Sequence, residues 1–206
     1  MRPKKHLFFL GISVSIGILI VASFYYPGGS QHDANGIGYS WQHNYLCNLF
    51  NEKAMNGRKN DARPIAIVGL LTLCASLALF FYRFSLKIQD KTASKVIKYA
   101  GISAMIFSVL VATPYHDLMT TVSSILGLVA LFYILVFIVK SKLTLFKILT
   151  LLTMVLLYAN NYIYYTQQGL SILPIMQKIT LFISLVLMLC LDYFTTKDDF
   201  KQKTKS

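Results

Sequence analysis

Two adjacent residues near the middle of the chain, His116 and Asp117, are the strongest candidates for chemistry. An imidazole beside a carboxylate can transfer a proton near neutral pH, and both groups are good metal ligands. They lie in the short segment TPYHD between two apolar runs. A simpler interpretation makes Asp117 the N-cap of a helix that begins near Leu118, with Pro114 ending the helix before it. Both interpretations stay open on the sequence alone.

His43 is the natural partner for a reaction at His116. An outer-leaflet lipid hydrolase would use His116, Asp117 and His43 as its catalytic candidates. A zinc site needs three or four protein ligands, and the histidines and acids of this chain show no recognised zinc-binding spacing. The sequence also lacks a phosphate-binding loop, a GxSxG elbow, an HExxH pair and a dinucleotide fingerprint. We therefore predict no metal and no cofactor, and we favour a binding protein over an enzyme.

Other polar side chains gather where apolar runs meet the segments that connect them. Polar groups at such positions are costly in a membrane and indicate function. We expect one outward-facing pocket to collect them and to bind a lipid headgroup or a small polar ligand. The predicted ligand-binding residues are Trp41, His43, Asn44, Asn48, Arg63, His116, Asp117, Asn160, Asn161 and Gln177. An equally good interpretation of Asn160 and Asn161 is hydrogen bonding between helices, and Ser123 and Ser124 are interpreted as small packing residues.

The elements that must position these residues are membrane helices. The chain of 206 residues is 55% hydrophobic and only 14% charged, whereas soluble domains carry roughly 25% charged residues. About 20 apolar residues in a helix cross a bilayer core. Six such runs predict spans at about 7–26, 64–82, 97–114, 118–139, 143–164 and 175–195. The predicted fold is an all-α bundle of six transmembrane helices in a single membrane domain over residues 1–206.

The first run has a second interpretation, because it follows Arg2, Lys4 and Lys5. Basic residues before an apolar stretch are typical of a secretory signal peptide. The stretch is long, however, and no small-x-small cleavage site precedes Tyr26. We therefore favour a retained helix over a cleaved signal.

The distribution of Lys and Arg predicts the orientation of the chain. With the N-terminus in the cytoplasm, the inner segments hold 15 Lys and Arg residues and the outer segments hold five, as expected from the excess of these residues in cytoplasmic loops. This bias accounts for the net charge of +12 without a nucleic-acid partner. The expected partners are membrane lipids, with a homo-oligomer or a partner membrane protein as alternatives. We predict a bacterial inner-membrane protein with both termini cytoplasmic, and a structural subunit of a complex is a further alternative for its function.

The longest connection, residues 27–63, is expected on the outer side. Its second half reads SWQHNYLCNLFNEKAMNG, and apolar residues recur there at helical spacing. This pattern predicts a short amphipathic helix over about 41–56, with Ser40 as N-cap and Gly57 as the stop. We expect the helix to lie at the membrane interface, with Trp41 at headgroup depth.

One segment of this connection resembles a known family. A polar stretch ends in an Asn-Gly loop, and Asn-x-x-Arg-Pro then opens the second apolar run. Together with the six spans, this resembles the bacterial membrane proteins of the domain-of-unknown-function 998 group. The residues that carry the resemblance are Asn48, Leu49, Asn56, Gly57, Asn60, Arg63 and Pro64. The resemblance implies a six-span fold whose polar first outer loop leads into the second helix.

A more distant resemblance is to the alkaline ceramidase and progestin-receptor-like superfamily of membrane hydrolases. The residues Trp41, Asn44, Tyr45, Phe50 and Asn51 look like the first-loop motif of that superfamily, and His116 looks like its mid-chain histidine. That superfamily has seven spans and a zinc-binding His pair on the last one. This chain has six predicted spans and no histidine in the last, so the resemblance implies no catalytic zinc ligands here.

Overall fold

A computed structural model of the chain describes residues 6–201. Six long helices account for most of these residues, and the described part contains no β-strand. The long helices are α1 (His6–Phe24), α2 (Arg63–Ser85), α3 (Lys91–Val109), α4 (His116–Lys140), α5 (Thr144–Thr166) and α6 (Leu173–Phe194). Three short 3-10 helices are η1 (Leu46–Phe50), η2 (Leu110–Ala112) and η3 (Asp198–Phe200). All six long helices are apolar and long enough to cross a membrane, so the predicted fold class is confirmed.

The third helix begins earlier than the apolar run predicts. It starts at Lys91 rather than at residue 97. The Asp90 carboxylate accepts a hydrogen bond from the Ala93 backbone N–H at 2.7 Å and caps the helix. The added turn carries lysines, which have a high helix propensity but lower the mean hydropathy of the segment. A search for apolar length therefore finds only the later part of this helix.

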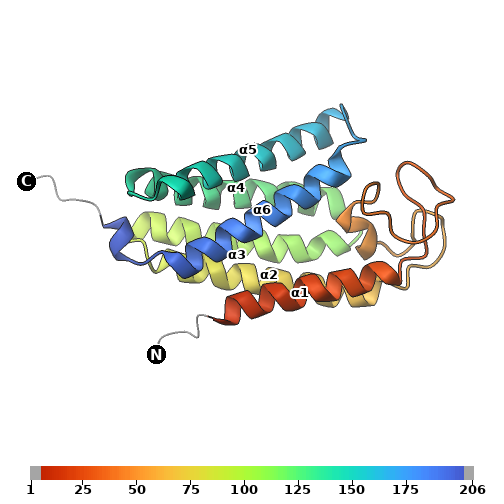
Figure 1. The fold of residues 1–206 in the computed structure, drawn as a ribbon, viewed down its shortest axis with the longest axis horizontal. Helices are drawn as coiled ribbons and strands as arrows, with labels where there is room; N and C mark the ends of the chain where they lie inside the picture. Colours follow the sequence, from red (N-terminus) through yellow and green to blue (C-terminus); the bar gives the residue numbers. More distant parts are fainter. Residues whose placement is uncertain (1–5, 202–206) are drawn as a thin grey trace, which may run out of the picture.

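The six helices run up and down, each antiparallel to the next (Figure 1). Residues 25–62 form a large loop at one end of the bundle. The short connections 113–115 and 167–172 lie at the same end. We call this end the loop end. Helix α1 begins and α6 finishes at the opposite end, which we call the terminal end (Figure 1).

The first three helices pack closely through small residues. The Ser15 hydroxyl of α1 donates to the Gly69 carbonyl of α2 at 2.8 Å. A side chain at Gly11 would overlap Ser76, and one at Gly101 would overlap Phe81. Small residues at such contacts let membrane helices approach and pack by van der Waals contact. The α1–α2–α3 half of the bundle therefore leaves little free space.

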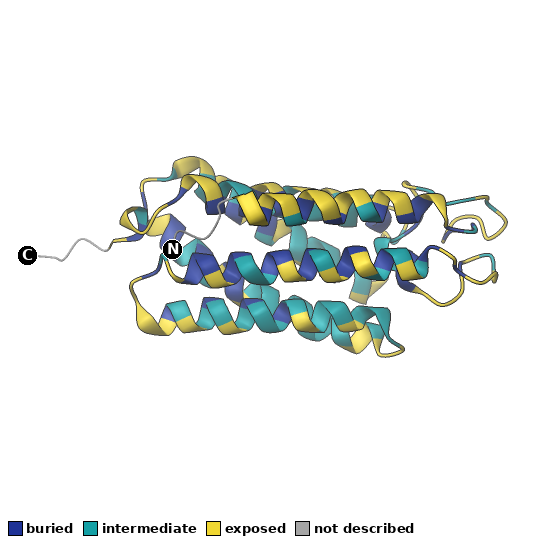
Figure 2. Cartoon of the chain, turned by 90° about the horizontal axis from the view of Figure 1, so that it is seen from below, coloured by how far each residue is buried: buried dark blue, intermediate teal, exposed yellow. Residues whose placement is uncertain are grey.

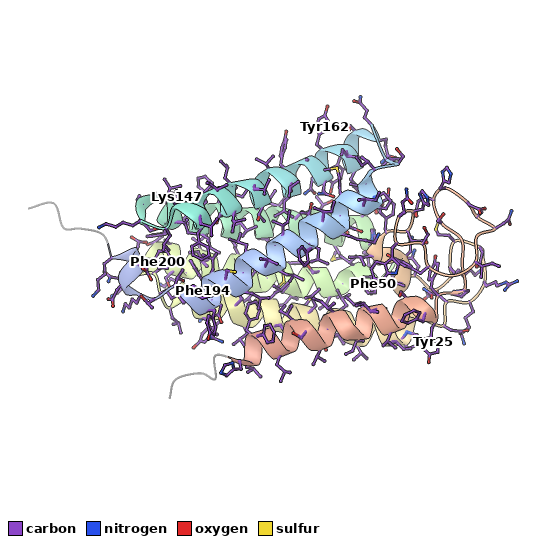
Figure 3. All side chains as sticks on the ribbon, viewed as in Figure 1. Tyr25, Phe50, Lys147, Tyr162, Phe194 and Phe200 are labelled. Carbon is purple, nitrogen blue, oxygen red and sulfur yellow. The ribbon has the colours of Figure 1, made fainter. Side chains whose placement is uncertain are left out.

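The terminal end is closed by aromatic packing and by a buried ion pair. The Phe84 ring of α2 stacks edge-on against Phe200 of η3, with ring centroids 5.3 Å apart, and Figure 3 shows Phe200 at this end. Arg83 of α2 and Asp192 of α6 lie 3.1 Å apart with both side chains buried. A buried ion pair needs good geometry to offset the loss of solvation, and here it ties α2 to α6.

The outer faces of the helices carry large exposed apolar residues. Exposed positions recur along the length of the bundle (Figure 2), and examples are Phe9, Ile106, Leu145 and Phe182. Such faces suit lipid rather than water. Helix α5 has the fewest buried residues of the six helices, namely Thr150 and Thr153. Its loose packing leaves space between α5 and the rest of the bundle.

The predicted amphipathic helix over 41–56 is wrong. Only Leu46–Phe50 is helical there, as a single short 3-10 segment whose N-cap is Tyr45 rather than Ser40. Asparagine side chains compete with the helix for backbone groups. The Asn44 amide oxygen accepts from the Ser40 N–H at 2.9 Å, and the Asn48 amide oxygen accepts from the Tyr45 N–H at 2.7 Å. The stretch therefore folds as turns around buried amides.

Candidate functional site

A cavity of about 400 Å³ lies between the helices and extends to the loop end of the bundle, and we call that end of the cavity its mouth. Its lining on α4 runs from His116 to Leu131, a distance of about 22 Å along a helix. All six helices and η1 contribute to the wall. The polar lining residues are Tyr45, Cys47, Cys74, Ser108, His116, Thr120, Ser123, Ser124, Asn160, Asn161, Tyr164, Gln177, Thr180 and Ser184.

Helix α4 presents one polar face to the cavity. His116, Thr120, Ser123 and Gly127 recur at spacings of four, three and four residues, which place them on one side of a helix. No heavy atom lies within 4 Å of the position that a Cβ would take at Gly127. The missing side chain therefore widens the cavity at this point.

Helices α5 and α6 supply the opposing wall. The Asn160 amide nitrogen donates to the Thr180 hydroxyl at 2.6 Å and to the Leu156 carbonyl at 2.8 Å. The predicted hydrogen bonding between helices is thus confirmed for Asn160. The Asn161 amide nitrogen donates to the Leu157 carbonyl of its own helix at 2.8 Å. Both asparagines also line the cavity, and their predicted role in ligand binding stays a prediction.

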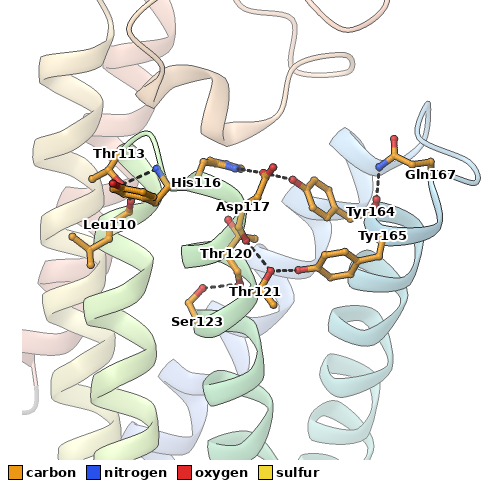
Figure 4. Close-up of polar contacts among 11 residues, drawn as sticks. Leu110, Thr113, His116, Asp117, Thr120, Thr121, Ser123, Tyr164, Tyr165 and Gln167 are labelled. Carbon is orange, nitrogen blue, oxygen red and sulfur yellow. Dashed lines mark hydrogen bonds and ion pairs between the residues drawn. The ribbon is translucent and has the colours of Figure 1, made fainter.

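A network of side chains closes the gap between α4 and α5 at the mouth (Figure 4). The Asp117 carboxylate lies 3.0 Å from the His116 Nδ1 atom and accepts a hydrogen bond from the Tyr164 hydroxyl at 2.6 Å. The hydroxyls of Thr121 and Tyr165 lie 2.5 Å apart. The N-cap interpretation of Asp117 is wrong, because α4 begins at His116, two residues before Leu118, and has no side-chain cap. Asp117 lies in the first turn, where the helix dipole favours its charge.

The short helix η1 covers the loop end of the cavity. Its Leu46 backbone N–H donates to the Gln177 amide oxygen of α6 at 3.0 Å. The neighbouring Lys178 ammonium donates to the Asn44 carbonyl. Figure 3 shows Phe50 of η1 where the loop meets the helices. Side-chain contacts from α6 therefore hold the cover in place.

Cys47 is the cysteine in this cover, and it lines the cavity. Burial raises the pKa of the Cys47 thiol to about 11, because a low-dielectric environment disfavours the thiolate. A protonated thiol is a weak nucleophile and a weak metal ligand. Cys47 therefore contributes to the cavity as a small polarisable wall residue.

Six of the ten predicted ligand-binding residues are absent from the cavity wall. One of them, Asp117, contacts His116 beside the wall, and the other five lie elsewhere. His43 stacks on His32, with ring centroids 4.8 Å apart, and does not join His116 in the cavity wall. Trp41 packs edge-on against Tyr39. Asn44 and Asn48 are buried inside the loop, where they bond to backbone groups. These residues build the loop rather than the cavity.

Arg63 is also structural. Its Nε atom donates to the Phe50 carbonyl at 3.0 Å, and its guanidinium lies 3.3 Å from the Glu52 carboxylate. It also reaches the Ala112 carbonyl of η2 at 3.5 Å. Arg63 therefore ties the start of α2 to η1 and to η2.

The cavity wall carries no fixed charge. None of the lining residues is Asp, Glu, Lys or Arg. Within residues 6–201, no three His, Cys, Asp or Glu side chains lie together as a possible metal site. The wall therefore offers hydroxyls, amides, phenols and one imidazole as its recognition groups.

Two polar atoms in the wall are buried without a hydrogen-bond partner. They are the Thr120 hydroxyl oxygen and the Asn160 amide oxygen. A buried polar group without a partner costs about 1–3 kcal/mol, so nearly all such groups in proteins are paired. Both atoms belong to residues that line the cavity.

Sequence reasoning missed much of this wall. Thr120, Thr180 and Ser184 were not predicted as site residues, and Ser123 and Ser124 were interpreted as packing residues although they line the cavity. Helical periodicity could have found them. Polar residues recur at helical spacing on α4 from His116 and on α6 from Gln177.

In three comparisons with known proteins, no family model, no curated protein and no solved structure matches this chain.

Proposed function

We propose that this integral membrane protein binds an uncharged amphiphilic molecule, such as a lipid with a neutral headgroup, in the cavity under η1. The observation that carries the proposal is the composition of the cavity wall, which has amide and imidazole groups toward the mouth, is apolar at depth and is free of charged residues. A volume of about 400 Å³ falls in the range of about 300–1,000 Å³ that is common for small-molecule sites.

The wall changes character along its length. His116, Asn161 and Gln177 lie in the turns of their helices nearest the loop end. Phe81, Leu131 and Met188 line the cavity farther along their helices, toward the terminal end. An amphiphile would place its headgroup among the first set and its hydrocarbon chain among the second. Apolar contact with the chain and hydrogen bonds to the headgroup would then both favour binding.

The absence of charge in the described wall limits the headgroup. A phosphate or carboxylate buried without a charged partner would lose much of its solvation energy. His116, the basic residue of the wall, already faces the Asp117 carboxylate. A hydroxyl, amide or ester headgroup suits this wall better than an anion.

The distribution of Lys and Arg supports a mouth on the outer side of the membrane. Positive-inside reasoning places the loop end on the outer face of the membrane, so the proposed ligand would enter from the outer leaflet or the outer aqueous phase. This orientation is part of the proposal.

The test is a substitution that places a large side chain in the cavity at a glycine with free space around it. A leucine at Gly127 would project into the free space there, so Gly127→Leu should weaken binding of dodecanol at least about tenfold, as loss of a well-packed site implies. Gly17→Leu is the matched control, because Gly17 is also helical and free of neighbours but lies on the exposed side of α1. Titration followed by native mass spectrometry measures the adduct directly. Equal adduct formation by both variants would contradict the proposal.

Hydrolysis of a neutral lipid ester is a second candidate, favoured by the contact of His116 with Asp117. A carboxylate at Nδ1 can orient an imidazole so that Nε2 takes a proton from water, and the 3.0 Å separation fits that role. The expected result is release of laurate from monolauroylglycerol, lost in His116→Ala and reduced in Asp117→Asn. Release of laurate that is unchanged in both variants, or no release above the rate without protein, would contradict the hydrolase proposal and leave the binding proposal standing.

A further inference from the structure

We infer that the cavity selects ligands that carry a hydroxyl group, and that Asn160 and Thr120 recognise this hydroxyl. The inference rests on the proposed function and deepens it by naming the class of headgroup. Its basis is the pair of unpartnered polar atoms in the wall, one on α5 and one on α4.

The Asn160 amide is satisfied on one side only. Its nitrogen donates two hydrogen bonds, to the Thr180 hydroxyl and to the Leu156 carbonyl. These bonds fix which end of the amide is the nitrogen, because the Leu156 carbonyl can only accept. The amide oxygen is therefore an acceptor that still requires a donor. A ligand with acceptor atoms alone could not supply one.

Thr120 differs from three other threonines of the membrane helices. Thr121, Thr150 and Thr153 each donate to the carbonyl four residues earlier, which is the usual solution for a hydroxyl in a membrane helix. The Thr120 hydroxyl makes no such bond and is shielded from solvent. It can both donate and accept, and it still requires a partner.

A hydroxyl on the ligand complements both atoms. It can donate its proton to the Asn160 amide oxygen and accept one from the Thr120 hydroxyl. A site built to bond a hydroxyl discriminates strongly against an analogue without it, because its own buried polar groups then stay unpaired. The expected ligands are long-chain alcohols and glycerides with a free hydroxyl, rather than their ethers or fully esterified forms.

The experiment compares dodecanol with dodecyl methyl ether, which keeps the oxygen acceptor and removes the donor. Native mass spectrometry of the full chain measures the affinity of each compound. The wild-type protein should bind dodecanol about five- to tenfold more tightly, since this ratio corresponds to one net hydrogen bond.

The variants assign the preference to the two residues. Thr120→Val keeps the shape of the side chain and removes its hydroxyl, so it should reduce the preference to about twofold or less. Asn160→Leu should do the same, and Thr120→Val carries the test if loss of the Thr180 contact prevents folding of that variant. Thr153→Val is the matched control, because Thr153 of α5 is absent from the cavity wall and donates to the Leu149 carbonyl of its own helix, and it should keep the full preference.

Each outcome has a distinct meaning. Equal binding of alcohol and ether by the wild-type protein overturns the inference and leaves the proposed function standing, as would be expected if ordered water satisfied the two atoms. An unchanged preference in Thr120→Val and Asn160→Leu also overturns it. Failure of both compounds to bind contradicts the proposed function itself.

Discussion

Asp117 shows how a single residue gains a role from its neighbours in space. Its position after Pro114 fits a helix cap, and no partner beyond His116 is visible in the chain. The fold brings Tyr164 from α5, and the Asp117 carboxylate accepts the phenol proton at 2.6 Å. A carboxylate that could have capped its own helix instead connects two helices at the mouth of the cavity. The same contact orients His116, which both the binding and the hydrolase proposals use.

Cys47 provides a residue-scale prediction, because its pKa lies near 11. We expect a protein with Cys47 as its sole cysteine, made by Cys74→Ala and Cys190→Ala, to react slowly with N-ethylmaleimide. At pH 8 the thiolate fraction, and with it the rate, should be about a hundredfold below that of a thiol with an unshifted pKa near 9. Because the pKa is raised, the rate should keep rising about tenfold per pH unit up to about pH 10.

The denatured protein is the control for this reaction, since unfolding exposes Cys47 and returns its pKa to the ordinary range. A folded-state rate that levels off near pH 9 would mean that the thiol is solvated. The cover formed by η1 would then be open in solution.

At the scale of elements, the loop of residues 25–62 is built on buried asparagines. Asn44, Asn48 and Asn60 are at most 3% exposed. The Asn60 amide nitrogen alone donates to the carbonyls of Asn48, Leu49 and Asn51. These bonds replace the backbone ladder that a helix would have provided. They also hold η1 in the position that covers the cavity.

Asn60→Ala should therefore loosen the loop while the helices stay folded. The substitution removes the donor for several buried carbonyls, so opening of the loop should become easier by about 2 kcal/mol. This corresponds to roughly thirtyfold faster proteolysis within the loop if opening limits access to the protease. Asn35→Ala is the control, because the Asn35 side chain is exposed. Equal cleavage rates for the two variants would contradict the role assigned to the Asn60 amide.

At the scale of the whole molecule, the bundle has two ends of different character. Within residues 6–201, the terminal end holds most of the Lys and Arg residues and is closed by Phe200 and by the pair of Arg83 with Asp192. The loop end holds the cavity mouth and its cover. An even number of helices places the start of α1 and the end of α6 on one side (Figure 1). Lys and Arg content therefore predicts the orientation of the entire bundle at once.

Reporter fusions test this orientation. A reporter placed after Lys142, in the connection between α4 and α5, should report a cytoplasmic location, and one inserted at Gly57 should report an external location. The physical reason is the cost of moving clustered Lys and Arg across the membrane during insertion. The opposite pattern would place the cavity mouth on the cytoplasmic side, and the proposed ligand would then come from the inner leaflet.

The sequence by itself determined the number, approximate bounds and membrane character of the six helices. The length of an apolar run is a local property of the sequence, and it decides whether a helix can cross the bilayer core. Knowledge of tertiary contacts was therefore not needed to predict it. Polar residues near the loop ends of spans are also visible in the sequence, and His116, Asn160, Asn161 and Gln177 of the predicted set line one cavity.

Tertiary structure alone decided which polar residues meet in the cavity and which build its cover. Asn44 and Asn48 have the same chemistry as Asn160 and Asn161, yet the first pair satisfies backbone groups in the loop. The helix over 41–56 failed for this reason, because distant partners such as Gly29 and Gln177 offered better hydrogen bonds than the helix did. Thr120 and Thr180 became site residues because α4, α5 and α6 pack loosely enough to leave a space between them. Such a space depends on how side chains from distant segments fill a volume, and no local pattern of residues specifies that.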